Sequence, residues 1–219
     1  MAISEPTTLA TDYILGTLSG VFGVLLLQHN RSPRQRAVTL WAAALLAAAA
    51  GSFVGGTYHG FPSALGARAA TVWTLTTISM GLASFLLLAA ALTAAFSGRW
   101  RTWLLGLAAI KLCIYVVWML GHDEFRYVIY DYGSTLAILL ILIAAGQTHG
   151  ASGHRALIAS GILVSIAAAV VQQSGFRLHQ HFNHNDLMHV VQMGGVWLLF
   201  KGGAGLRDNT KTRRDTTRT

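Results

Sequence analysis

Seven long apolar segments separated by short breaks dominate this chain of 219 residues. Runs such as Ala42–Ala50 and Leu136–Ala145 have no polar face, and a helix that is apolar all round is buried in lipid or inside a bundle. A membrane helix needs about 20 mostly apolar residues. The sequence therefore predicts an all-α integral membrane bundle of seven transmembrane helices. The predicted spans are Tyr13–Gln28, Ala37–Gly56, Thr71–Phe96, Trp103–Leu120, Tyr127–Gly146, Leu157–Gln172 and Asn185–Phe200.

Composition supports the same class. Hydrophobic residues make up 53% of the chain and charged residues only 11%, whereas soluble domains have about 25% charged residues. So few charges are unable to cover the surface of an ordinary soluble domain, and so much apolar matter excludes a disordered chain.

The net charge of +8 comes from basic residues placed in short loops between the apolar segments and in the C-terminal tail. This placement is typical of topology signals, and no basic face for nucleic acid is present. With seven spans, the basic loops fall on one side, which predicts an external N-terminus and a cytoplasmic C-terminus. We expect a multi-pass protein of the cell membrane, of the bacterial inner-membrane type. Its transmembrane domain covers residues 1–206, and a disordered basic cytoplasmic tail covers 207–219.

With this topology, many polar side chains fall near the external ends of the spans, including Asp12 and most of the histidines. A polar layer inside a membrane is costly unless it lines a cavity, so the sequence predicts one extracytoplasmic site. Its densest part is the string His184-Asn185-Asp186-Leu187-Met188-His189. The residues on one stripe of this helix are His181, Asn185, His189 and Gln192.

Imidazoles and carboxylates in this layer suggest a metal. A catalytic zinc takes three protein ligands and keeps one position for a water, whose pKa it lowers toward neutrality. Asp186 and His189 lie one helical turn apart, and His59 ends the second span, so these three are the predicted zinc ligands. Each also has a structural alternative, because His59 can sit at the membrane interface and Asp186 can cap the last helix.

Two further charges lie within the spans. Asp131 is the predicted proton acceptor or the partner of a ligand imidazole, and a neighbouring histidine such as His184 is the other candidate for moving a proton. Lys111 is a candidate because an intramembrane charge is functional by default, although it can also pair with a carboxylate.

Tyr58-His59 near the end of the second span and His189 in the seventh resemble motifs of the seven-helix membrane hydrolase superfamily. That superfamily includes alkaline ceramidases, adiponectin-receptor-like proteins and Per1-like proteins. Its members carry Ser and His near the end of helix two, Asp in helix three and HxxxH in helix seven around a zinc, and characterised members hydrolyse lipid amides. The HNDLMH string also resembles one in a family of uncharacterised bacterial membrane proteins.

The sequence departs from the superfamily pattern at several positions. Asn185 stands where the first helix-seven histidine is expected, Gly55 stands four residues before His59, and the third span has no Asp. The resemblance implies a zinc-dependent hydrolase of a lipid amide or ester at the outer leaflet, with a membrane lipid as substrate. Asp131 would then replace the missing acid. The alternatives are an ion or proton transporter, and a non-catalytic receptor-like protein that binds lipid.

Overall fold

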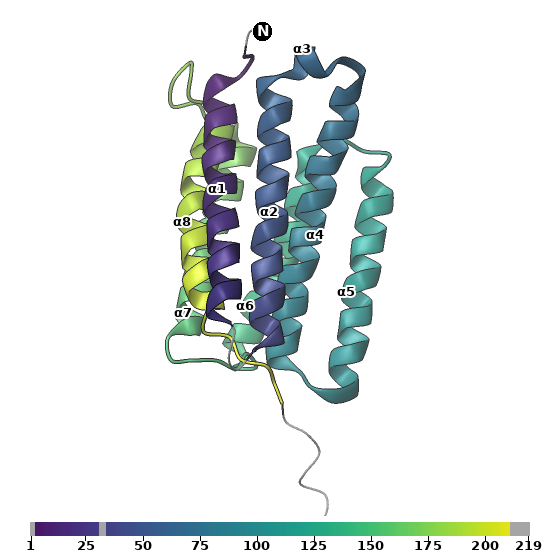
Figure 1. Cartoon of the computed structure of the whole chain (residues 1–219), viewed down its shortest axis with the longest axis vertical. Helices are drawn as coiled ribbons and strands as arrows, with labels where there is room; N and C mark the ends of the chain where they lie inside the picture. Colours follow the sequence, from purple (N-terminus) through teal and green to yellow (C-terminus); the bar gives the residue numbers. More distant parts are fainter. Residues whose placement is uncertain (1–2, 31–33, 211–219) are drawn as a thin grey trace, which may run out of the picture.

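The computed structural model of the chain describes residues 3–30 and 34–210. Seven long helices stand side by side in one bundle, and two short turns join the second to the third (Figure 1). The helices are α1 (Pro6–His29), α2 (Arg36–Gly60), α3 (Pro62–Leu65), η1 (Gly66–Arg68), α4 (Ala69–Ala95), α5 (Gly98–Met119), α6 (Phe125–Ala144), α7 (His154–Ser174) and α8 (His184–Gly203). Each predicted span coincides with one long helix, so the predicted all-helical bundle is confirmed.

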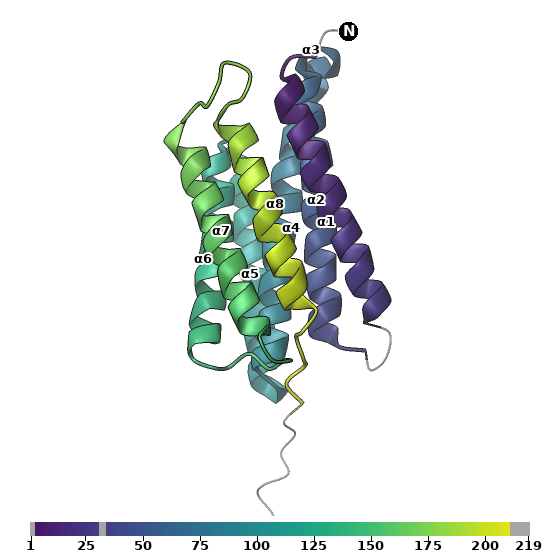
Figure 2. The same cartoon turned by 90° about the vertical axis from the view of Figure 1, so that its left-hand side faces the viewer.

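By length and composition, six of the long helices in the described part of the chain can cross a membrane, and the protein is therefore a multi-pass membrane protein. The seventh, α8, runs alongside them in the same bundle (Figure 2). Its hydropathy is lower because it carries His184, Asp186, His189, Gln192 and Lys201.

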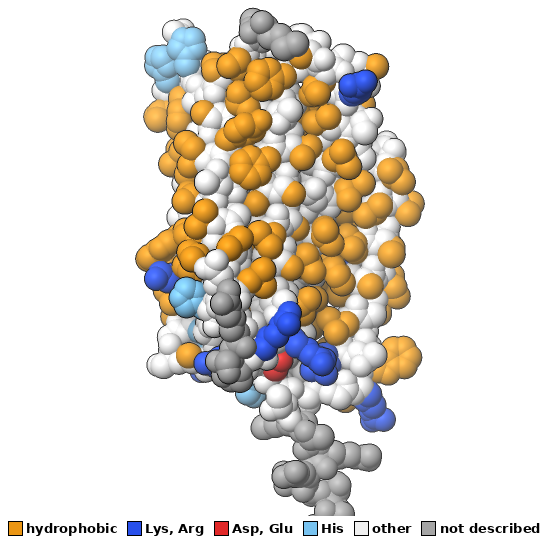
Figure 3. All heavy atoms as spheres, in the orientation of Figure 1, with side chains coloured by type: hydrophobic (Ala, Val, Ile, Leu, Met, Phe, Trp, Pro, Cys, Tyr) orange, Lys and Arg blue, Asp and Glu red, His pale blue; other side chains and the backbone are white. Residues whose placement is uncertain are grey.

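Six helices form a ring. In order around it, α1 packs on α2, α2 on α4, α4 on α6, α6 on α7, α7 on α8 and α8 on α1, while α5 lies outside the ring against α4. Apolar side chains cover the flank of the bundle, and most of the basic side chains of this face gather at its lower end (Figure 3). That asymmetry is the one that predicts a cytoplasmic C-terminus.

The last helix begins at a complete capping box. The Asn183 side chain accepts hydrogen bonds from the backbone N–H groups of Asn185 and Asp186, at 2.7 and 3.3 Å. In return, Asp186 Oδ2 accepts the backbone N–H of Asn183 at 2.7 Å. This arrangement satisfies N–H groups that a helix start leaves free, and it gives Asp186 the capping role that was the structural alternative to metal ligation.

The segment after α8 closes the opposite end of the bundle. Asp208 accepts the backbone N–H groups of Arg36 and Ala37, at 2.9 and 2.8 Å, and so caps the start of α2 from the far end of the chain. Arg207 N–H donates to the carbonyl of His149 at 2.9 Å. Within the predicted tail 207–219, Arg207, Asp208 and Asn209 therefore have hydrogen-bond partners in the bundle, and the open end of α2 needs the acceptors that Asp208 supplies. Residues 211–219 lie outside the described part of the chain.

Replacing Asp208 by alanine should destabilise the bundle by about 1 kcal/mol, because two N–H groups of α2 lose their acceptor. Asp208→Asn should lose much less, since asparagine is an equally good capping residue. Unfolding of both variants in detergent micelles measures the difference. Equal stability of the alanine variant and the wild type would contradict a capping role.

Candidate functional site

A buried carboxylate and a buried imidazole meet between α1 and α8. His189 Nε2 lies 3.2 Å from Asp12 Oδ1, and the two side chains are 9% and 7% exposed. On the other edge of the imidazole, His189 Nδ1 lies 3.0 Å from the hydroxyl of Thr11. Both nitrogens of the imidazole are therefore engaged by neighbours one residue apart on α1.

The hydrogen bonds define where protons lie in this pair. The Thr11 hydroxyl donates to the carbonyl of Thr8 at 3.1 Å, so it accepts from His189 Nδ1–H. One further proton then lies between His189 Nε2 and Asp12 Oδ1, bound either to the nitrogen or to the oxygen. In either arrangement the Asp12–His189 pair carries no net charge, which suits its burial.

Glycine in α2 makes room for Asp12. A Cβ added at Gly56 would lie 2.8 Å from the Cβ of Asp12 and 2.8 Å from the ring of Tyr13, closer than real Cβ atoms come. A larger residue at position 56 would push α1 away and move Asp12 relative to His189. Sequence reasoning placed Asp12 in the polar layer but not among the site residues. The predicted first span begins one residue after Asp12, whereas the structure includes Asp12 within α1, where a carboxylate in an apolar helix is a signal of function.

The pair lies at one end of a cavity of about 750 Å³ in the middle of the helix ring. Its walls come from α1, α2, α4, α6, α7 and α8 and are mainly apolar. The polar side chains gather toward the end that holds Asp12 and His189. They include Ser52, His59, Thr76, Gln172, His184, Asn185 and Gln192.

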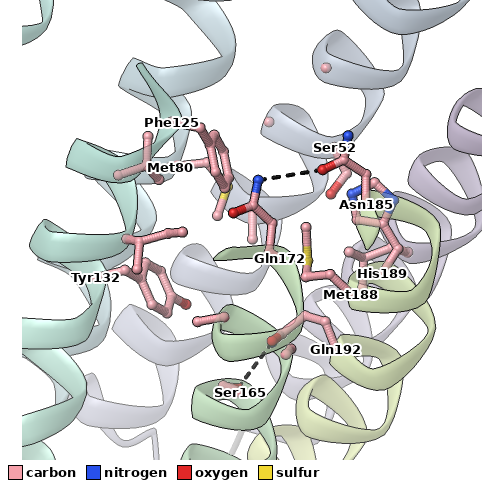
Figure 4. Close-up of a pocket in the computed structure, with 18 of the residues that line it drawn as sticks. Ser52, Met80, Phe125, Tyr132, Ser165, Gln172, Asn185, Met188, His189 and Gln192 are labelled. Atoms are coloured by element: carbon pink, nitrogen blue, oxygen red, sulfur yellow. Dashed lines mark hydrogen bonds between the residues drawn. The ribbon is translucent and has the colours of Figure 1, made fainter. Parts of the chain in front are cut away.

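Amide side chains tie α7 and α8 together at this polar end (Figure 4). Gln192 Nε2 donates to the Ser165 hydroxyl at 3.1 Å, and Gln172 Nε2 donates to Asn185 Oδ1 at 3.4 Å. Figure 4 shows Met188 and Gln192 on one wall and Tyr132 on the opposite one. The far end of the cavity is walled by Leu45, Leu87, Leu136 and Leu199.

The structure brings part of the predicted zinc set to this cavity. His59 and His189 both line it, and so does His184, whose Nδ1 is buried with no hydrogen-bond partner among the described residues. His59 Nδ1 lies 3.5 Å from Glu5 Oε2. Asp186 is 1% exposed and uses one oxygen in the cap, while its Oδ1 lacks a hydrogen-bond partner in the described chain.

No group of three His, Cys, Asp or Glu side chains in residues 3–30 and 34–210 is arranged so that it could hold a metal ion. Both ring nitrogens of His189 have protein partners, whereas Asp186 uses Oδ2 in the cap and its Oδ1 has no partner among the described residues. Zinc ligation by His59, Asp186 and His189 stays a prediction.

The two other intramembrane charges lie elsewhere. Lys111 Nζ on α5 contacts Asp131 Oδ1 at 2.5 Å and the Asp131 carbonyl at 3.0 Å. It also lies 3.2 Å from Thr135 Oγ1 and 3.4 Å from Ser84 Oγ. The structure therefore places Asp131 in an ion pair that joins α5 to α4 and α6, and not beside the histidines of α2 and α8. Its predicted catalytic role is not supported by this position, because a carboxylate held by a lysine is not a free proton acceptor.

The remaining candidates take different positions. The ring of Tyr58 packs at a tilt against Trp73, with ring centroids 4.9 Å apart, and both flank His59. Asn185 and Gln192 line the cavity as described above. Lys111 does not line the large cavity but a smaller one of about 320 Å³ between α5 and α6.

Comparison with known proteins gives one match. A family model described as a family of unknown function, DUF6962, matches residues 7–208. Neither the curated proteins nor the solved structures gave a match. Because the matched region runs through all seven long helices, the chain belongs to this family of unknown function, DUF6962.

Proposed function

We propose that this membrane protein binds one lipid-like amphiphile inside its helix ring. The observation that carries the proposal is the cavity itself, which is large enough for a small ligand, apolar along most of its walls and polar at one end. A hydrocarbon chain fits against the leucines of the far end. The polar headgroup then lies beside Asn185, Gln192 and the Asp12–His189 pair.

The headgroup that suits this end is uncharged. The described residues that line the cavity include no lysine or arginine, and Asp12 and His189 neutralise each other. A buried charge needs a partner of opposite charge, whereas a hydroxyl, carbonyl or amide needs only hydrogen bonds. Gln172, Gln192 and Asn185 supply both donors and acceptors.

The test compares two ligands that differ only in charge. Hexadecanol should raise the unfolding temperature of the purified protein in detergent, because a ligand that binds only the folded state stabilises it. Hexadecanoate, with the same chain length, should stabilise it less. Ser52→Phe places an aromatic ring in the cavity and should abolish the response. Ser160→Phe is the matched control, because Ser160 is exposed on α7 and is not among the residues that line the cavity.

Two results would count against this function. One is stabilisation by hexadecanol that survives Ser52→Phe, which would place the ligand on the outer surface. The other is an equal rise in unfolding temperature with both ligands, which would show that the polar end of the cavity does not distinguish between the two headgroups.

The Asp12–His189 pair favours a second candidate, hydrolysis of a lipid amide or ester. For this reaction Thr11 would have to release His189 Nδ1 and Nδ1 would have to lose its proton, because both ring nitrogens are engaged in the arrangement described above. An imidazole held by a carboxylate and with a free nitrogen could then take a proton from an attacking water beside a carbonyl bound at the polar end of the cavity. In the zinc-dependent form predicted from the sequence, His59 and His189 would be ligands, and the unpartnered Oδ1 would make Asp186 the third. The zinc would supply an activated water when bound.

Metal analysis separates the two hydrolytic forms. The zinc-dependent form expects purified wild-type protein to retain zinc and His189→Ala to lose it. It also expects release of a fluorescent amine from a long-chain N-acyl probe to stop when a chelator removes the metal. Hydrolysis that continues without metal but fails in Asp12→Asn would support the metal-free pair. A wild-type protein that binds the probe without cleaving it would leave lipid binding as the function.

A further inference from the structure

The cavity reaches the outside of the bundle between α6 and α7. Gly133 on α6 lines the cavity and is also exposed on the surface. Ile166 and Val170 on α7 do the same, with exposed fractions of 40% and 63%. Gln173 and Ser174 at the upper end of α7 also line the cavity and are exposed, so the residues that are both lining and exposed follow the α6–α7 side up to the polar end of the cavity.

Gly133 and Ile166 lie at matching heights. Figure 2 shows α6 and α7 side by side and joined at their lower ends, so the first residue of α6 and the last of α7 share the upper end. Gly133 lies eight residues from Phe125, and Ile166 lies eight residues from Ser174. At 1.5 Å per residue, both are roughly 12 Å below the upper helix ends.

Packing between these two helices is weak at this point. α7 packs along α8, whereas its contact with α6 is much less extensive. A Cβ added at Gly133 would find no atom within 4 Å, so the space beside this glycine is open. The absence of a side chain at position 133 therefore leaves a gap in the wall of the ring.

The gap opens toward lipid. The hydrocarbon core of a bilayer is about 30 Å thick, so a position roughly 12 Å below the helix ends falls within one leaflet. The side chains at its rim, Ile129, Ile166 and Val170, are all apolar. Water has no reason to fill such an opening, whereas a lipid tail can pass through it.

We infer that the ligand of the cavity enters sideways from the membrane, between α6 and α7, through the gap beside Gly133. The inference rests on the proposed function, and it identifies the source of the ligand as the leaflet next to the Asp12–His189 end. It also explains why the ring is least tightly packed at the α6–α7 contact. A ligand that arrives in the bilayer can enter headgroup and chain together, without passing through water.

The test uses a long-chain alcohol with a photoreactive diazirine in its chain, added to phosphatidylcholine vesicles that contain the full-length protein. Illumination at successive times and peptide mapping give the initial rate at which cavity residues are labelled. Gly133→Phe should lower this rate to near background, because its side chain starts in open space beside the helix and occupies the gap. Gly106→Phe is the matched control and should leave the rate unchanged, because Gly106 is exposed on α5 with equally open space and does not line the cavity.

A second variant separates blocked access from a filled cavity. Val170→Trp places a larger side chain on the α7 side of the gap, at a position that already faces outward, and so narrows the gap. It should slow the labelling of cavity residues without changing the final extent of labelling. Labelling at the wild-type rate in both variants would overturn the inference, and the ligand would then enter at the aqueous end of the bundle. If the wild-type cavity is never labelled, the proposed function itself is wrong.

Discussion

Lys111→Met is expected to destabilise the protein by about 3–5 kcal/mol, because it leaves the carboxylate of Asp131 buried without a partner. The Asp131 side chain is 8% exposed, and its charge is met by the Lys111 ammonium at 2.5 Å. Removing only one partner of a buried ion pair costs far more than removing both. The loss should also loosen α5, which lies outside the helix ring, packs mainly on α4 and contacts α6 through Lys111.

The double variant Lys111→Met/Asp131→Leu should therefore be more stable than Lys111→Met alone. Equilibrium unfolding in mixed micelles of the two single variants and the double variant gives the coupling between the residues. Arg126→Met is the control, because its ion pair with Glu124 is exposed and should contribute less than about 1 kcal/mol. If Lys111→Met and Arg126→Met had the same small effect, the buried pair would not hold α5 in place.

Gly81→Ala should cost about 3 kcal/mol, at the upper end of what an extra buried methyl group costs. A Cβ at this position would overlap the ring of Tyr115, which packs directly against the backbone of α4. Tyr115 is 6% exposed and donates a hydrogen bond from its hydroxyl to the carbonyl of Thr77 at 2.8 Å. Displacing the ring removes both the packing and the hydrogen bond.

Gly81→Ala should cost little stability once the ring of Tyr115 has been removed. In a Tyr115→Ala background, Gly81→Ala should be neutral or slightly stabilising, because alanine favours a helix by up to about 1 kcal/mol over glycine. Gly106→Ala in the wild type should behave in the same way, since its added methyl group meets nothing. Thermal unfolding of the wild type, the three single variants and the double variant checks this. A large loss in the Tyr115→Ala background would show that another neighbour, and not the ring, excludes a side chain at position 81.

Hydropathy was sufficient to predict the bundle, because each helix can be recognised from its own run of apolar residues. The gathering of His59, His184 and His189 at one end also followed from helix direction alone. The partner of His189 did not, because the contact with Asp12 joins the first helix to the last and depends on rotation of both about their axes. Asp131 was assigned to the wrong neighbours for the same reason. In the structure its carboxylate contacts Lys111 on α5.

The order of synthesis gives the segment after α8 a particular significance. The ribosome makes the start of α2 long before Asp208, which follows Ala37 by 171 residues. Until that residue emerges, the first turn of α2 has no acceptor from the chain's end, and the lower edge of the bundle stays open. In a truncated or stalled product, the first turn of α2 would lack the acceptor from Asp208. This difference distinguishes such a product from a finished molecule even when every helix has been inserted.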